Sequence, residues 1–286
     1  MIKQLANQLK TSLGFGKRKR LSDLQTNVDC GFNASQSALV VHGLHKSATM
    51  FLYKFFADLC GRIDVPIYSI HNGKTPEPSI DHSFVLCPVR SFKMDGFSFP
   101  SLSNTRHLFQ IRDPRDVLVS EYYSIGWRHS VEGWPQEDLD RRELIRTLSI
   151  DEYVLREPEI SKYPLVDRFE PLMSLEAGAF EVIKYETMVT DFPAWLNRCL
   201  KAVDIDSASN ANANFVTSLL DRYRDEFRAD QSESAHKRNV TPGDHRNKLK
   251  PKTVEVLNDR FAAVLNTFEY KPDARASGHI LNDPTG

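Results

Sequence analysis

The sequence predicts an α/β protein whose central sheet is mainly parallel and flanked by helices. Short apolar runs alternate with segments of helical periodicity along most of the 286 residues. The first run, ALVVHG at 38–43, is apolar nearly throughout, which is typical of a strand buried on both faces of a parallel sheet. Proline, glycine or polar residues separate the runs, so the expected units are strand–helix–strand crossovers.

Each further element follows from the same pattern. A helix is expected over 48–60, where Met50, Phe51, Phe55 and Leu59 fall at helical spacing. The later strands expected are VPIYSI (65–70), SFVLCPV (83–89), HLFQI (107–111) and AFEVIKY (179–185). The later helices expected run from Pro114 to Trp127, over most of 128–178 with breaks at 133–135 and Pro158, and near 191–203, 212–228 and 251–267.

Net charge and cysteine usage exclude some functions. Lys and Arg total 37 against 38 Asp and Glu, so the net charge is −1 and no overall basic field recruits nucleic acid. The four cysteines show no CxxC spacing, which disfavours a zinc site and predicts reduced thiols in a cytoplasmic protein. No apolar run reaches about 18 residues, the length of a membrane span, and the N-terminus lacks the apolar stretch of a signal peptide.

The chain is expected to divide into three parts. Residues 1–36 form a basic helix and a polar linker, 37–270 form the α/β domain, and 271–286 form a C-terminal tail. The first part carries the run KRKR (17–20) after a stripe of apolar residues. Its helix either packs with its charges in solvent or makes a peripheral contact with a membrane or partner through residues 1–20. The oligomeric state is left open.

The turn at 44–50, between the first strand and the first helix, predicts an anion site. Ligands of parallel sheets lie beyond the carboxyl ends of the strands, where unpaired N–H groups and the helix dipole favour negative charge. Lys46 adds a positive charge, and Ser47 and Thr49 add hydroxyl donors. His45 stands where a nucleoside-triphosphate loop requires glycine, and no carboxylate motif for Mg²⁺ is apparent, which disfavours a metal-dependent kinase.

A second segment, LFQIRDPRDVLVSEYYS (108–124), ends a strand at Arg112 and opens a helix at Pro114. Arg112 is placed to reach the same crevice as the first turn. Its alternative fate is a salt bridge with Asp113 or Asp116.

Four segments together resemble the PAPS-dependent sulfotransferases. HKSATMFL looks like the family's PKSGTTWL loop, and IRDPRDVLVSEYY is similar to RNPKDVxVSxYY. FEVIKYETMVTDFPAWLNRCLKAV and RNVTPGDHRNKL resemble two later segments in the family's order. The resemblance implies a P-loop-like sulfotransferase fold. It also implies transfer of a sulfuryl group from PAPS (3′-phosphoadenosine 5′-phosphosulfate) to an acceptor hydroxyl or amine by in-line displacement without a metal.

The resemblance further implies roles for individual residues. Lys46 is expected to stabilise charge on the leaving product PAP, and Ser120 to restrain Lys46 as well as bind the 3′-phosphate. Phe51 takes the place of a tryptophan that stacks on adenine. The residues implied to bind the donor are Lys46, Ser47, Ala48, Thr49, Met50, Phe51, Arg112, Ser120, Tyr185 and Arg238.

The sequence departs from the family pattern at a few positions. Ala48 replaces a loop glycine, so the backbone there is expected to be unstrained or the loop to differ slightly, and His245 replaces a tryptophan. Arg90 occupies the place of the family's catalytic histidine, and an arginine cannot act as a base at neutral pH.

The expected catalytic base is His71, at the end of the strand 65–70, because an imidazole titrates near neutrality. Glu77 and His82 are the next choices, and Arg90 is a candidate for holding an anionic acceptor or the transferring group.

The acceptor is expected to be a small molecule or a glycan bound by residues 122–178, which combine aromatic rings with arginines. Two other functions are weighed: a non-catalytic sulfotransferase-like protein that binds PAP or PAPS, and a P-loop-type nucleotide kinase.

Overall fold

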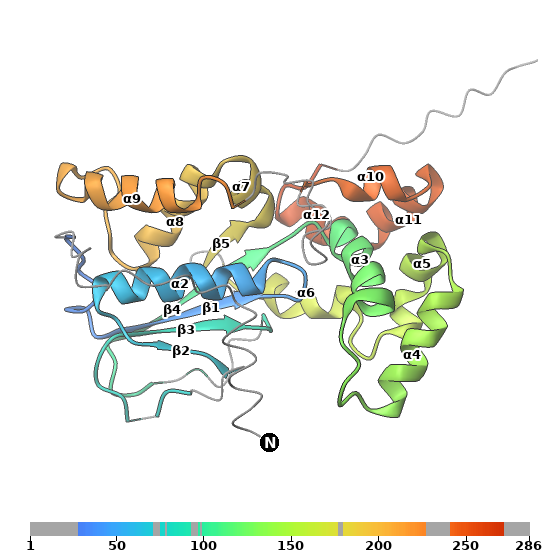
Figure 1. The fold of residues 1–286 in the computed structure, drawn as a ribbon, viewed down its shortest axis with the longest axis horizontal. Helices are drawn as coiled ribbons and strands as arrows, with labels where there is room; N and C mark the ends of the chain where they lie inside the picture. Colours follow the sequence, from blue (N-terminus) through green and yellow to red (C-terminus); the bar gives the residue numbers. More distant parts are fainter. Residues whose placement is uncertain are drawn as a thin grey trace, which may run out of the picture.

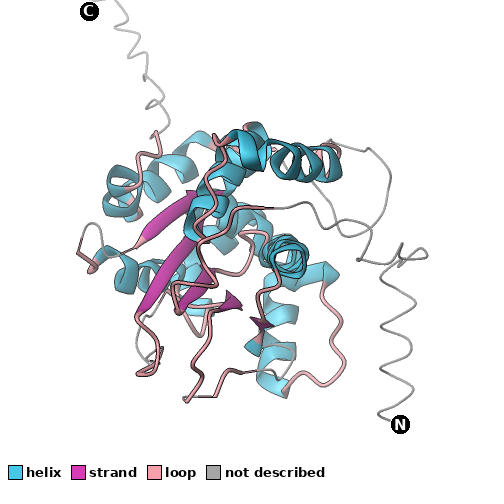
Figure 2. Cartoon of the chain, turned by 90° about the vertical axis from the view of Figure 1, so that its left-hand side faces the viewer, coloured by secondary structure: helices cyan, strands magenta, loops and turns pink. Residues whose placement is uncertain are grey.

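A computed structural model describes residues 28–70, 75–77, 79–92, 97, 99–176, 180–226 and 241–271. Within these residues five parallel strands form one sheet in the order β2-β3-β1-β4-β5. The strands are β1 (Ser37–Gly43), β2 (Ile67–Tyr68), β3 (Phe84–Val89), β4 (Asn104–Ile111) and β5 (Glu181–Lys184). A strand is found at each of the five expected places, although β2 and β5 are shorter than the expected 65–70 and 179–185. The mainly parallel sheet flanked by helices is confirmed (Figure 2).

Strand β1 lies at the centre of the sheet and is buried along its whole length. Leu39 and Val41 pack into the core on the α2 side, whereas Ala38 and Val40 join a second cluster on the opposite face. Alternating apolar side chains therefore serve both faces, which explains why the strand reads as a continuous apolar run.

The helices that follow or cover the strands carry the rest of the core. Helix α2 lies along the sheet, and the strands point toward α3 and its neighbours (Figure 1). The helices are α2 (Thr49–Ile63), α3 (Pro114–Tyr123), the π-helical turn η3 (Ser124–Arg128), α4 (Gln136–Thr147), α5 (Ile150–Ile160), α6 (Leu165–Met173), α7 (Tyr185–Thr190), α8 (Phe192–Ala202), the 3-10 turn η4 (Asn210–Asn212), α9 (Ala213–Tyr223), α10 (Asp244–Lys248), α11 (Pro251–Arg260) and α12 (Ala262–Thr267).

The break expected at Pro158 is wrong, because α5 continues through Ile160. Proline has no N–H for the carbonyl four residues earlier, which belongs to Val154. Arg260 of α11 supplies substitute donors: its Nη1 donates to Val154 O and its Nη2 to Leu155 O, each at 2.7 Å. The Arg260 guanidinium thus donates hydrogen bonds to carbonyls of α5 near the position where proline has no N–H to donate.

Two further boundaries differ from expectation. The helix expected over 251–267 is two helices, α11 and α12, separated at Phe261, whose side chain is buried. The helix that starts at Pro114 turns into the π-helical η3 at Ser124.

The polar segment before β1 packs on the domain where the structure describes it. Phe32 is fully buried, Gly31 N donates to Asp204 O at 3.3 Å, and Asp29 N donates to Asn212 Oδ1 at 2.8 Å. The basic helix expected in residues 1–20 and most of the tail 271–286 lie outside the described residues. No helix among the described residues combines the length and apolar character needed to cross a bilayer.

Candidate active site

The loop between β1 and α2 is held in a compact left-handed turn. Lys46 and Ala48 have φ values of 73° and 64°. Ser47 is buried, and both its N–H (3.1 Å) and its Oγ (2.7 Å) donate to Leu44 O. A Cβ on Gly43 would lie 3.1–3.2 Å from the side chains of Leu52, Ser47 and Thr49, so any larger residue here would have to displace these side chains slightly.

Ala48 overturns the expectation of an unstrained backbone at this position. Its φ of 64° and ψ of 38° are in the left-handed region, which costs a residue with a Cβ about 1–2 kcal/mol. Helix α2 starts directly after it without a side-chain cap. Without a capping side chain, the first N–H groups of α2 are of the kind that can bind an anion.

Two side chains at the carboxyl end of β4 donate hydrogen bonds to backbone carbonyls of this loop. Gln110 is fully buried; its Nε2 donates to Ser47 O, and its Oε1 accepts from Trp195 Nε1 at 3.1 Å. Arg112, at the carboxyl end of β4, donates from Nη1 to Lys46 O at 3.0 Å. The loop conformation therefore depends on the strand next to β1 in the sheet.

Arg112 also faces the predicted donor site. Its guanidinium lies 4.2 Å from the centre of the Tyr185 ring, and its Nη2 is 4.0 Å from Asp116 Oδ2. Its Nε is buried and has no hydrogen-bond partner within the described residues. An arginine that stacks on a tyrosine and keeps a buried N–H unpaired suits a phosphate bound beside an aromatic base.

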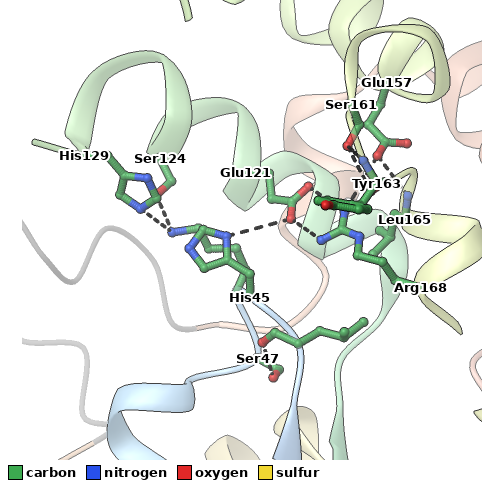
Figure 3. Close-up of polar contacts among 12 residues, drawn as sticks. His45, Ser47, Glu121, Ser124, His129, Glu157, Ser161, Tyr163, Leu165 and Arg168 are labelled. Atoms are coloured by element: carbon green, nitrogen blue, oxygen red, sulfur yellow. Dashed lines mark hydrogen bonds and ion pairs between the residues drawn. The ribbon is translucent and has the colours of Figure 1, made fainter. Parts of the chain in front are cut away.

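The Lys46 ammonium points to the opposite side of the loop, toward η3. Its Nζ donates to Ser124 Oγ and lies 3.4 Å from His129 Nε2, and Ser124 Oγ lies 2.8 Å from His129 Nε2 (Figure 3). Ser120, expected to restrain Lys46, is one turn earlier on α3, and its hydroxyl makes no hydrogen bond within the described part of the chain.

Burial and neighbouring charges set the protonation of this pair. Burial, followed by repulsion from Arg112, Arg90 and Arg128, lowers the pKa of Lys46 to about 8, although Glu121 acts against this. Burial and the nearby ammonium lower the pKa of His129 to about 4. At neutral pH the site therefore holds a charged lysine beside a neutral imidazole.

His45 precedes Lys46 and meets a buried ion pair of α3 and α6. Its Nδ1 lies 3.9 Å from Glu121 Oε1, while Arg168 holds both oxygens of Glu121 at 2.8 and 3.1 Å. Burial opposes ionisation of Glu121, but its contacts with His45 and Arg168 lower its pKa to about 2. Figure 3 shows His45 between His129 and Glu121.

A cavity of about 230 Å³ opens beside this group. Its walls come from the loop and from the elements between 121 and 168. They combine ionisable and apolar side chains: His45, Glu121, Ile125, His129, Trp134, Asp138, Arg141, Ile145, Tyr153, Ile160, Ser161, Tyr163 and Arg168. Most of its lining lies in the region expected to bind the acceptor, and one lining residue, His129, contacts Lys46.

The remaining expected residues lie in different surroundings. The ring of Phe51 is 9% exposed and packs against Trp195 and Tyr223, with centroid distances of 5.8 and 5.6 Å, so little of it is open to a base. Met50 beside it is 65% exposed. The expected residues His71 and Arg238 lie outside the described residues.

The other candidate bases are separated from Lys46. His82 is exposed, pairs with Asp81 at 3.5 Å and precedes β3, at the amino edge of the sheet. Glu77 is also exposed, and no contact joins it to Lys46 within the described residues. Arg90 follows β3 at the carboxyl edge, and its charge lowers the pKa of Lys46, His45 and His129.

The late segment that resembles the family's GDWKN stretch is fixed to α3. The buried carboxylate of Asp116 accepts from Gly243 N at 2.6 Å, His245 N at 3.0 Å and His245 Nδ1 at 2.6 Å. His245, which replaces the family's tryptophan, thus forms an ion pair inside the protein. Asp116 places α10 directly beside Arg112.

From the sequence, no individual role at this site was expected for Ser124, His45, Glu121 or Gln110, and His129 was covered only as part of the expected acceptor region 122–178. Two of them carried a signal. Gln110 is a lone amide in a buried apolar strand, and His45 directly precedes the loop lysine. The roles of Ser124 and His129 depend on the π-helical turn, which no sequence pattern indicated.

Comparisons with known proteins agree with this geometry. A family described as the sulfotransferase domain matches residues 98–269, more than half of the chain, starting after the Lys46 loop. No curated protein matches the sequence. A mouse sulfotransferase, SULT7A1, in complex with PAP is similar in structure (TM-score 0.54, 14% identity, 84% of this chain and 87% of that one). A retinol dehydratase in complex with androsterone and the inactive cofactor PAP is also similar (TM-score 0.50, 11% identity, 86% and 85%).

Proposed function

The chain belongs to the sulfotransferase domain family, and on that premise we propose that it moves a sulfuryl group from PAPS to an acceptor hydroxyl or amine. No finding favours a non-catalytic binding protein or a nucleotide kinase. Both structural neighbours named above are complexes with PAP, which supports PAPS as the donor.

One observation carries the donor assignment: the uncapped start of α2 adjoins the guanidinium of Arg112, which is bound to the loop backbone. Arg112 Nη1 holds Lys46 O, and its buried Nε has no partner within the described residues. These groups fit a ligand that carries one phosphate on a helix N-terminus and another beside an arginine. In this proposal Ser47, Ala48, Thr49 and Met50 surround the 5′-phosphate.

The second phosphate of the donor is assigned to the other side of Arg112. Arg112, Ser120 and Arg238 bind the 3′-phosphate in this proposal. Tyr185, whose ring lies against the Arg112 guanidinium, contacts the adenine. Phe51 has little exposed surface left for stacking on the adenine, because its ring is only 9% exposed.

PAPS supplies an activated sulfuryl group whose transfer leaves negative charge on PAP. In this proposal Lys46 stabilises that charge, because its ammonium is half-buried and its contacts within the described residues are with Ser124 and His129. Stabilising charge that develops during the reaction is worth more in such a site than in water. The displacement is proposed to proceed without a metal.

The acceptor is proposed to be a small molecule or glycan bound in the 230 Å³ cavity, where Trp134 and Tyr163 offer rings and Arg141 a positive charge. We also propose a cytoplasmic location, because the four cysteines are free thiols and three of them are buried in the core.

Calorimetry with PAP tests the donor site. Wild-type protein should bind PAP and should gain about 2.7 kcal/mol of stability at a hundred times the dissociation constant. Arg112→Ala should weaken binding at least tenfold. The matched control is Arg106→Ala, on the same strand at the opposite edge, where the arginine pairs with Asp204 at 2.7 Å. Absence of PAP binding, or tighter binding of Mg²⁺-ATP, would refute the donor assignment.

Mass spectrometry then tests transfer. Wild-type protein incubated with PAPS and a panel of phenols, alcohols, amines and glycans should give a product carrying one sulfuryl group. PAP binding without any transfer or PAPS hydrolysis across the panel would favour a binding protein instead.

A further inference from the structure

We propose that His45, held by the buried Glu121–Arg168 pair, takes the proton that the acceptor loses during sulfuryl transfer. This inference rests on the proposed function. It differs from the sequence-based choice of His71 and assigns a catalytic role to the residue directly before Lys46.

The reaction requires a proton acceptor in this cavity. When an acceptor hydroxyl bonds to sulfur, the bond from that sulfur to the phosphate oxygen of the donor breaks and the O–H proton must leave. In the proposed step this proton goes to His45 Nε2, and the resulting imidazolium later releases it to water. Lys46 beside it stabilises the charge on the departing phosphate.

The contacts of His45 leave one nitrogen available for that proton. Nδ1 lies 3.9 Å from Glu121 Oε1, and an anionic carboxylate there favours a proton on Nδ1. Nε2 then carries the lone pair, and it has no hydrogen-bond partner within the part of the chain that the structure describes. His45 also lines the cavity in which the acceptor is proposed to bind, so Nε2 is available to the acceptor.

His129 lines the same cavity but is a poorer base. Its Nε2 already meets the Ser124 hydroxyl at 2.8 Å and the Lys46 ammonium at 3.4 Å, so its lone pair is engaged. Its role is to position Lys46. Glu121 is also unsuited, because Arg168 occupies both of its oxygens.

The charges around His45 come from every neighbouring element. Glu121 of α3, which Arg168 of α6 keeps ionised, stabilises the imidazolium, whereas Lys46 and Arg90 oppose it. The neutral His129 ring lies 5.2 Å from the His45 ring. Burial is the largest influence and lowers the pKa of His45, so the ring is neutral at pH 7 and able to accept a proton.

Two measurements test the role of His45. The first is the turnover of His45→Asn with PAPS and whichever phenol or alcohol of the panel the wild type sulfates best, from pH 5.5 to 9. We expect kcat to fall about 100-fold or more at pH 7.5, with PAP affinity within twofold of wild type, and the acid limb of the wild-type profile to disappear. His82→Asn, a histidine at the other edge of the sheet, should match wild type.

The second measurement needs no turnover. Nitrogen-15 NMR of the wild-type protein at pH 7, with the His45 ring identified by its loss in His45→Asn, should show a proton on Nδ1 and a lone pair on Nε2. Glu121→Gln should weaken that preference.

The outcomes separate the two proposals. An Nε2–H tautomer, kcat within threefold of wild type in His45→Asn, or an acid limb lost in His129→Asn instead would overturn the role of His45. Failure of wild-type protein to bind PAP would overturn the proposed function and leave the tautomer result unaffected.

Discussion

Replacing Asp116 by asparagine should destabilise the protein substantially, because this carboxylate is fully buried and holds three donors. It accepts from Gly243 N, His245 N and His245 Nδ1 at 2.6–3.0 Å, with Arg112 Nη2 4.0 Å away. An asparagine presents an NH₂ group to at least one of these donors and removes the charge that pairs with His245.

The expected cost is about 3–5 kcal/mol, the range for breaking a buried ion pair by removing one partner. Burial opposes both charges, but the hydrogen bond between them lowers the pKa of Asp116 below 3.8 and raises that of His245 above 6.5. The aspartate's contribution is lost as pH falls through its folded pKa. The histidine's contribution is complete below 6.5 and is lost as pH rises through its folded pKa.

The difference between variant and wild type should therefore be largest between about pH 4 and 6.5 and should shrink toward either side. Urea unfolding at pH 5.5 and 8.5 measures it. Asp221→Asn is the control, because Asp221 forms an exposed ion pair with Arg224 and should cost less than about 1 kcal/mol. A cost for Asp116→Asn no greater than that of the control at pH 5.5 would refute the argument.

Four further results are expected. Lys46→Ala should abolish transfer while PAP binding survives in part, whereas Lys54→Ala, on the exposed side of α2, should leave both unchanged; undiminished transfer in Lys46→Ala would remove the role given to this lysine. PAP affinity should fall by up to about tenfold per unit as pH rises above 8, where free Lys46 loses its proton, and Lys46→Arg should flatten this dependence in calorimetry. Ala48→Gly should raise stability by up to about 1 kcal/mol by removing left-handed strain, while Ala194→Gly on the exposed face of α8 should lower it by about 1 kcal/mol; equal effects on melting would contradict the strain. Arg260→Ala should cost about 2–4 kcal/mol, because two carbonyls of α5 lose charged donors, against little change for the half-exposed Arg222→Ala; similar unfolding midpoints for the two would show that α5 does not need Arg260.

The sheet could be predicted because each strand is a short apolar run bounded by proline, glycine or polar residues. Such a run is typical of a strand buried on both faces of a sheet. The continuation of helix α5 through Pro158 could not be predicted from the sequence, because proline usually ends a helix. The donor that replaces the missing N–H comes from Arg260, 106 residues after Val154. The division of the helix at Phe261 could not be predicted either, because the apolar residues over 251–267 follow one continuous helical spacing.

The contacts around Arg112 were more predictable than those around Lys46 Nζ and His45. The Lys46 loop and Arg112 lie together as their strand-end positions suggested, since parallel strands bring their carboxyl ends to one edge. Tyr185, which only the family resemblance indicated, lies against Arg112. The partners of Lys46 and His45 come from α3 and η3, and their meeting depends on packing among helices rather than on any spacing near the loop.

The π-helical turn has a consequence for aligning this chain with its relatives. His129 N donates to Ser124 O at 3.0 Å, five residues back, so η3 holds one residue more than an α-helical turn would. An ungapped alignment with a relative that has an α-helical turn here will be out of register after 124–128, and each position of slippage corresponds to about 100° around a helix axis. A relative without this extra residue would aim a different side chain at the loop lysine, even where the neighbouring residues were identical.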